Sequence, residues 1–156
     1  MNPDADLLFV YGTLRAALAH DMHQLLSRHA DPVSGATARG ALYDLGQYPG
    51  LVATPGGDSI VRGEVYRLRS ETAARTLRTL DEYEGCAPTD PKPHEYRREK
   101  IQVTLADRST SGAWAYVLQR DTAGLPRIES GDSVARDVKS VAARFVAERP
   151  RTKKDQ

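Results

Sequence analysis

The chain has 156 residues, with 22 Lys and Arg against 21 Asp and Glu, and it contains a single Cys. This length suits one domain, long enough to bury about two-thirds of the surface of its unfolded chain. The net charge of +1 gives no global field for nucleic acid or an anionic membrane, and one cysteine excludes an internal disulfide and a cysteine-based metal cluster.

The first predicted element is a buried strand over residues 7–11, because this run is continuously apolar and aromatic. The turn Gly12-Thr13-Leu14 ends the strand and leaves backbone N–H groups without ladder partners. Such a concavity suits an anion or an oxyanion, although an ordinary strand-to-loop turn is the alternative interpretation. Residues 16–29 follow with apolar side chains at helical spacing, so we expect a short helix that stops before Asp31-Pro32.

The middle of the chain predicts three strands and a helix. One strand covers residues 40–46, residues 48–53 are a turn that leads into another, and the third strand covers residues 60–68, with clear alternation of apolar and polar side chains. Ser70 is the expected N-cap of a helix over 71–83, supported by an acidic residue in its first turn, and Gly85 is the expected C-cap.

The last third begins with a proline-rich loop over residues 87–94. Residues 96–105 and 112–118 form a predicted hairpin, and residues 132–148 a final helix. We therefore expect one domain over 1–148 and a basic, frayed tail over 149–156.

These elements do not alternate regularly between strand and helix, which argues against a doubly wound parallel sheet. We expect an α+β fold: a small, mixed, partly closed β-barrel with flanking helices. The apolar runs are far shorter than the roughly 18 residues of a membrane span, and the start of the chain is acidic where a signal peptide is basic. We expect a cytoplasmic protein with no nucleic-acid or membrane partner; its oligomeric state is left open.

The segment Leu80-Asp81-Glu82-Tyr83-Glu84-Gly85 is the sharpest chemical signal. Three carboxylates at a helix C-terminus are unfavourable beside the negative end of its dipole, so one of them is expected to turn inward as a proton-transfer group; a solvated helix end is the alternative. Cys86 lies at that same end, where a thiol is not activated. His20 and His23 are expected to be surface residues rather than metal ligands, since no matching ligand accompanies them.

Seven motifs in order resemble the γ-glutamylcyclotransferase-like, or AIG2-like, family over nearly the whole chain, from residue 8 to about 132. They are YGTLR (11–15), GxLYxLGxYPG (40–50), VxGEVY (61–66), LDEYEG (80–85), EYRR (95–98), AWAYV (113–117) and IESGD (128–132). The resemblance implies a compact β-barrel with a cavity at one end. It also implies cleavage of a γ-glutamyl amide through attack of the substrate's own α-amine, which releases 5-oxoproline without a cofactor, metal or covalent enzyme intermediate.

The resemblance assigns the role of general base and acid to Glu84; on pattern alone, Glu82 is the rival. The backbone of Gly12, Thr13 and Leu14 would bind the substrate carboxylate or the oxyanion. Tyr11 would line the cavity, and Tyr96 and Tyr116 could hydrogen-bond the substrate or serve as core aromatics with satisfied hydroxyls.

The chain departs from the family at Ser133, where the family often has Trp after SGD. Gly131 and Asp132 are expected to keep a structural role there, Asp132 as a helix cap. The proline-rich loop 87–94 is longer than in the smallest members and adjoins Glu84, so it is the expected determinant of substrate choice. A non-catalytic binding or scaffold protein on the same fold is the alternative function.

Overall fold

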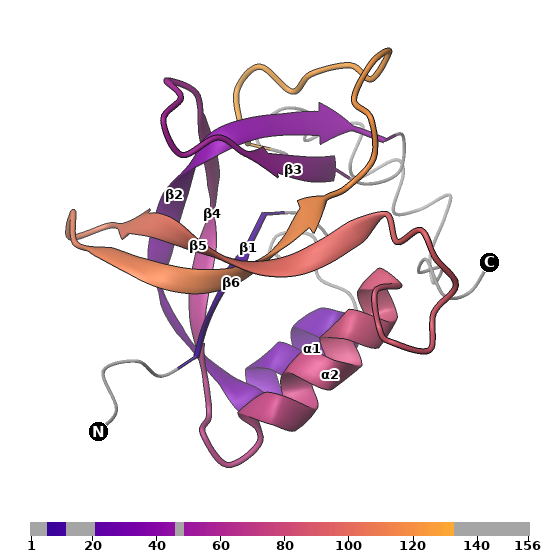
Figure 1. The fold of residues 1–156 in the computed structure, drawn as a ribbon. Helices are drawn as coiled ribbons and strands as arrows, with labels where there is room; N and C mark the ends of the chain where they lie inside the picture. Colours follow the sequence, from indigo (N-terminus) through magenta and orange to yellow (C-terminus); the bar gives the residue numbers. More distant parts are fainter. Residues whose placement is uncertain (1–5, 12–20, 46–48, 133–156) are drawn as a thin grey trace.

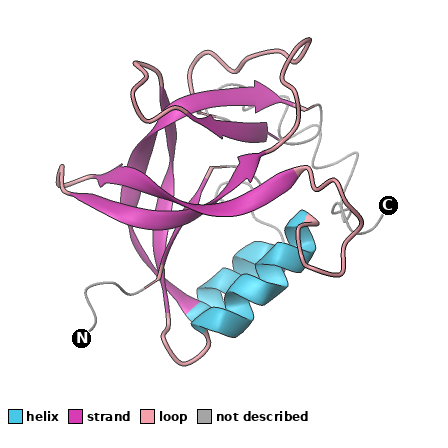
Figure 2. Ribbon diagram, viewed as in Figure 1, coloured by secondary structure: helices cyan, strands magenta, loops and turns pink. Residues whose placement is uncertain are grey.

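The structure, a computed structural model, describes residues 6–11, 21–45 and 49–132, and the side chains of α1 from Gln24 onward. Within these residues, six strands form one sheet that curls into a barrel, and two helices lie side by side against it (Figures 1 and 2). The elements in chain order are β1 (Leu7–Val10), α1 (Asp21–His29), β2 (Ala30–Asp44), β3 (Pro49–Ala53), β4 (Ile60–Leu68), α2 (Ala73–Glu84), β5 (Tyr96–Leu105) and β6 (Thr110–Leu118).

The barrel closes because five strands form an unbroken ring. β1 pairs with β4, β4 with β2, β2 with β5 and β5 with β6, all antiparallel, and β6 returns to β1 through a parallel bridge between Leu8 and Trp114. β3 is the additional strand, antiparallel to the second half of β2 and parallel to β6 at Leu51 and Val117. The predicted α+β class and small mixed barrel are therefore confirmed, and the ring of strands is complete.

Strand β1 shows how alternation builds two cores. Leu7, Phe9 and Tyr11 belong to the core inside the barrel, whereas Leu8 and Val10 belong to the core between the barrel and the helices. All five side chains are buried. Because β1 is covered on both faces, its sequence is apolar throughout, which is the pattern that predicted it.

Strands β4 and β5 have the predicted bounds, and β5 and β6 form the predicted hairpin. The predicted helix over 16–29 is helical from Asp21 onward, and its earlier residues lie outside the described ones. The predicted final helix, apart from its first residue, and the tail 149–156 also lie outside them. Among the described residues, no helix has the length and apolar character required to cross a membrane.

Strand β2 is much longer than predicted. The sequence predicts a strand over 40–46, whereas the structure extends it back to Ala30, with a register shift just after Pro32. The earlier half escapes notice because its inward-facing side chains are the small Ala36 and Ala38. Alternation of bulky apolar residues is the usual sign of a strand, and alanines at these positions do not produce it.

Helix α2 begins later than predicted. The helix starts at Ala73 and not at residue 71, and Thr72 replaces Ser70 at the N-cap, with no side-chain cap hydrogen bond among the described residues. The Thr72 N–H donates to the Arg69 carbonyl (3.1 Å), which closes a turn before the helix. The Thr72 hydroxyl instead lies 3.3 Å from His29 Nδ1 at the end of α1. The predicted N-cap at Ser70 is wrong because residues 70–72 form this turn and the helix begins only after it.

Gly131 holds the IESGD segment against the barrel. Its φ is +70°, and its carbonyl accepts a 2.7 Å hydrogen bond from the Arg62 N–H of β4. A Cβ at Gly131 would lie 2.1 Å from the Ile60 carbonyl oxygen, so only glycine fits. The expected structural role of Gly131 is confirmed, whereas the helix that Asp132 is expected to cap lies outside the described residues.

Candidate functional site

Glu84 is the last residue of α2, and its backbone is fixed by the turn that follows. Gly85 adopts the left-handed conformation (φ 77°) and donates its N–H to the Glu82 carbonyl (3.1 Å), while the Cys86 N–H donates to the Asp81 carbonyl (2.9 Å). This pair of bonds is a Schellman motif, which glycine permits without steric cost. The predicted C-cap role of Gly85 is confirmed.

The three carboxylates of this helix end have different surroundings. Glu82 is exposed, Glu84 is half-buried, and the Asp81 side chain is only 15% exposed. The sequence pattern leaves open which of them turns inward. In the structure Asp81 and Glu84 are both partly buried, whereas Glu82, the rival candidate for the base, faces solvent.

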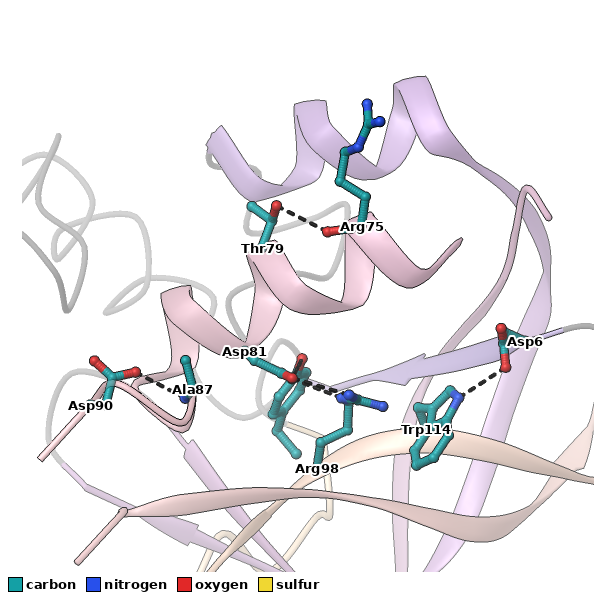
Figure 3. A network of polar contacts seen from close by, with 9 residues as sticks. Asp6, Arg75, Thr79, Asp81, Ala87, Asp90, Arg98 and Trp114 are labelled. Carbon is teal, nitrogen blue, oxygen red and sulfur yellow. Dashed lines mark hydrogen bonds and ion pairs between the residues drawn. The ribbon is translucent and has the colours of Figure 1, made fainter. Parts of the chain in front are cut away.

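Asp81 is held from both strands of the hairpin. Its carboxylate accepts two hydrogen bonds from the Arg98 guanidinium of β5, at 2.7 and 3.0 Å, and one from the Tyr116 hydroxyl of β6, at 2.7 Å. Figure 3 shows the Asp81 carboxylate pointing from α2 toward Arg98. The hydrogen bonds to Asp81 raise the pKa of the Arg98 guanidinium above its ordinary value. This fork of two parallel bonds fixes geometry as well as charge.

The Arg98 guanidinium also lies over the indole ring of Trp114, 4.5 Å from the ring centroid. The Trp114 Nε1–H donates to the Asp6 carboxylate (3.1 Å), as Figure 3 shows. Packing of this kind restricts the rotamers of Arg98, so the fork reaches Asp81 from a fixed direction.

Tyr11 connects this helix end to the predicted substrate-binding turn. Its hydroxyl donates to the Tyr116 carbonyl (2.5 Å) and accepts from the Leu51 N–H (3.1 Å), so it bridges β6 and β3 inside the barrel. Burial raises the pKa of the Tyr11 hydroxyl, and the negative charge of Glu84 raises it further. The Glu84 carboxylate therefore lies within charge-interaction range of Tyr11, the residue that directly precedes Gly12 in the sequence.

The same carboxylates act on Tyr116. Burial makes the largest contribution to the raised pKa of the Tyr116 hydroxyl. Its hydrogen bond to Asp81 and the negative charges of Asp81 and Glu84 raise this pKa further. The fold therefore brings Tyr11, Tyr116 and Glu84 into interaction with one another, although they lie far apart in the sequence.

Each of the three predicted binding tyrosines donates its hydroxyl proton within the protein. Tyr11 donates to the Tyr116 carbonyl, Tyr116 to Asp81, and Tyr96 to the Pro49 carbonyl at 2.6 Å. A phenol has a single O–H, so a substrate could meet these oxygens as hydrogen-bond acceptors. Their roles toward a substrate stay predictions, with that chemical restriction.

Cys86 follows the glycine and shares the surroundings of the site. Burial, with the charges of Asp81 and Glu84, raises the pKa of the Cys86 thiol to about 11. The thiol is thus protonated near neutrality, which agrees with the prediction that it is not a nucleophile.

The loop between α2 and β5 is organised by Asp90. Its carboxylate accepts from the Ala87 N–H (2.9 Å), as Figure 3 shows, and its own N–H donates to the Ala87 carbonyl (2.9 Å). The His94 Nε2 lies 3.2 Å from the Asp90 carbonyl oxygen. The predicted proline-rich loop therefore has a defined shape directly after the Glu84 turn.

Some predicted site residues lie outside the described ones. These are Gly12, Thr13 and Leu14 of the predicted binding turn, with Ser133, His20 and the side chain of His23. Among the described residues, no group of three His, Cys, Asp or Glu side chains is arranged to hold a metal ion.

The sequence profile of the γ-glutamyl cyclotransferase, AIG2-like family matches residues 8–133. The chain belongs to this family. It is 36% identical over 132 residues to the γ-glutamylcyclotransferase family protein YtfP of Escherichia coli K12, a match that covers 83% of this chain and 97% of YtfP. It is also 36% identical to a putative γ-glutamylcyclotransferase of Vibrio cholerae, over 81% of this chain and 93% of that protein.

Solved structures agree with the fold of this γ-glutamyl cyclotransferase family member. The crystal structure of an AIG2-like protein from Mus musculus superposes with a TM-score of 0.62 at 25% identity, over 80% of this chain and 86% of that one. The barrel with its helix layer is thus the architecture of the family.

In this family member, sequence reasoning missed the Asp81–Arg98 pair. Tyr96 was singled out, and Arg98 lies two residues later, on the same face of β5. Tyr96 packs into the core beneath the helices, so Arg98 also faces α2. That spacing was the available signal that a cation would meet the acidic helix end.

Proposed function

We propose that this protein is a γ-glutamyl cyclotransferase that converts a γ-glutamyl amide into 5-oxoproline and a free amine or amino acid. The observation that carries the proposal is the half-buried Glu84 at the fixed end of α2, within charge-interaction range of Tyr11 and Tyr116. Family membership supports the reaction class, and the position of Glu84 supports the residue that performs it.

In the proposed reaction the substrate acts on itself. The Glu84 carboxylate takes a proton from the α-ammonium, and the freed amine attacks the γ-carbonyl carbon, forming the C–N bond of the ring. The tetrahedral intermediate then breaks the bond to the leaving nitrogen, which receives the proton from Glu84. The Glu84 carboxylate takes the second proton from the ring nitrogen and passes it to the released amine, which departs as an ammonium ion. Atoms balance without water, because one amide bond replaces another.

The main task of the protein in this scheme is to hold the substrate folded. An intramolecular attack needs the amine and the carbonyl within about 3–3.5 Å, and holding that geometry can remove much of the barrier. We assign the backbone N–H groups of Gly12, Thr13 and Leu14 to the substrate carboxylate or the oxyanion. The oxygens of Tyr11, Tyr96 and Tyr116 can accept from the substrate amine.

The experiment measures 5-oxoproline release across a panel of γ-glutamyl amides, with the wild type, Glu84→Gln and Glu82→Gln. Loss of a general base predicts a fall of roughly a hundredfold or more for Glu84→Gln. Glu82→Gln is the matched control: it makes the same change two residues away, on an exposed side chain, and should retain activity. Circular dichroism would establish that both variants are folded.

The same assay in ¹⁸O-water separates this reaction from hydrolysis. Cyclisation yields 5-oxoproline without solvent oxygen, whereas hydrolysis yields labelled glutamate. Release that persists in Glu84→Gln would remove Glu84 as the base. If folded wild-type protein released nothing from any panel member, the binding or scaffold function would replace the proposed one.

A further inference from the structure

The ion pair beside the candidate base differs from the other ion pairs of the described residues. The side chains of Asp81 and Arg98 are 15% and 24% exposed, whereas those of Asp31 and Arg69 are 59% and 51% exposed. Exposed ion pairs contribute little to stability because water and salt screen their charges. The charges of a partly buried pair are screened less, so they act more strongly on neighbouring titratable groups. The enclosed pair also joins α2 to strand β5 of the barrel.

Asp81 and Glu84 lie three residues apart on α2. Side chains at this spacing are neighbours on one helix face, with Cβ atoms about 5–6 Å apart. Without a partner, the Asp81 charge would oppose ionisation of Glu84. Arg98 cancels that charge through two hydrogen bonds at 2.7 and 3.0 Å.

Three other groups of the described residues interact electrostatically with Glu84. They are Tyr11 at the end of β1, Tyr116 on β6, and Cys86 after the helix; burial and the nearby carboxylates keep all three protonated near neutrality. None of the three adds a charge there. Asp81 and Arg98 therefore place charge beside Glu84, and removal of either one changes the charge there.

We propose that Asp81, with Arg98 as its counter-charge, is the positioning residue for Glu84. The pair fixes the last turn of α2 against β5 and β6, and it removes the field that either charge alone would place beside the base. This inference rests on the proposed function and specifies how its base is held and tuned.

The two charges predict opposite effects when they are removed singly. Asp81→Asn leaves Arg98 uncompensated, which favours the ionised Glu84, so the acidic limb of the pH profile of kcat/KM should move to lower pH. Arg98→Gln leaves Asp81 uncompensated and should move the limb to higher pH. Each shift should be on the order of half a pH unit or more. The double variant should return the limb toward its wild-type position.

If Asp81 and Arg98 only stabilised the fold, their variants would behave differently. Loss of packing would lower stability or kcat in both single variants without opposed shifts of the limb. Tyr116→Phe removes a hydrogen bond to Asp81 and no charge, so it should leave the limb in place even where loss of its proposed contact with the substrate lowers kcat. Arg98→Lys keeps the charge and loses the fork, so it should lower kcat and leave the limb in place. Asp31→Asn breaks the exposed pair with Arg69 and should change neither kcat nor the position of the acidic limb.

The experiment combines these pH profiles with an NMR titration of the Glu84 carboxyl carbon, whose signal is assigned by its loss in Glu84→Gln. The titration midpoint should fall in Asp81→Asn and rise in Arg98→Gln. Midpoints that stay at the wild-type position, or move in the same direction, would overturn the inference. If Asp81→Asn does not fold, Arg98→Gln against Arg98→Lys makes the same distinction.

The NMR readout keeps the two proposals separable. Absence of 5-oxoproline release by the wild type would refute the proposed function, whereas the midpoints would still decide whether Asp81 and Arg98 control Glu84. Release by the wild type with unmoved midpoints would refute the inference alone.

Discussion

Gly131→Ala tests how the IESGD segment is held against the barrel. The new Cβ would lie 2.1 Å from the Ile60 carbonyl oxygen, about an ångström inside van der Waals contact. Relief of this contact must break the 2.7 Å hydrogen bond between Arg62 and Gly131 and loosen the packing of Ile128, which is 4% exposed.

The expected loss of unfolding free energy can be assembled from these parts. The left-handed conformation (φ 70°) costs an alanine about 1–2 kcal/mol, the lost hydrogen bond about 1 kcal/mol, and the partial exposure of Ile128 another 1–2 kcal/mol. The sum is about 3–5 kcal/mol, a large part of the stability of a typical domain.

Gly124→Ala is the matched control. Gly124 also has a positive φ, 82°, but a Cβ there would meet no atom within 4 Å. It should therefore cost only the conformational part, about 1–2 kcal/mol. Urea unfolding followed by circular dichroism measures both variants. A Gly131→Ala cost no larger than that of Gly124→Ala would refute the close approach to β4.

Three other changes test the helix layer and the surroundings of Glu84. Leu80→Ala, at a fully buried position in the core between barrel and helices, should cost about 2–5 kcal/mol in urea unfolding; a cost below 1 kcal/mol would contradict that packing. The pKa of the Cys86 thiol is raised from 9.0 to about 11, so at pH 8 Cys86 should react with iodoacetamide roughly a hundredfold more slowly in the folded than in the unfolded chain. Its reactivity in the folded chain should rise as the pH approaches 11. Equal rates in the folded and unfolded chains would count against a buried thiol. Asp90→Ala removes the acceptor of the Ala87 N–H and should change KM across a panel of leaving amines more than it changes kcat; a uniform change for every amine would exclude this loop as the selector.

The sequence predicted the elements whose side chains alternate clearly. β4 and β5 have the predicted bounds because bulky residues mark their buried faces. The first half of β2 lacked that mark, since alanines line the barrel interior where Phe9 fills the space. Helix α2 starts later than predicted because residues 70–72 form a turn, which a local capping pattern does not distinguish from a first helical turn.

The candidate site was predictable to a similar degree. The LDEYEG pattern located the acidic helix end and Gly85 its termination, because both are local features. Distinguishing Asp81 from Glu82 and Glu84 required knowing which strand lies beneath the helix. Arg98 is 17 residues from Asp81, so the pairing follows from the packing of α2 on the hairpin.

The closure of the barrel between β1 and β6 also bears on how the chain folds during synthesis. Asp6 and Trp114, joined by a hydrogen bond, are 108 residues apart, so β1, the first of the described strands, cannot complete its pairing before β6, the last of them, is made. β1 can pair with β4 much earlier, but its other edge stays open until β6 emerges. An open, apolar strand edge invites pairing with other chains. We therefore expect the barrel to close late in synthesis and the open edge of β1 to be prone to aggregation until then.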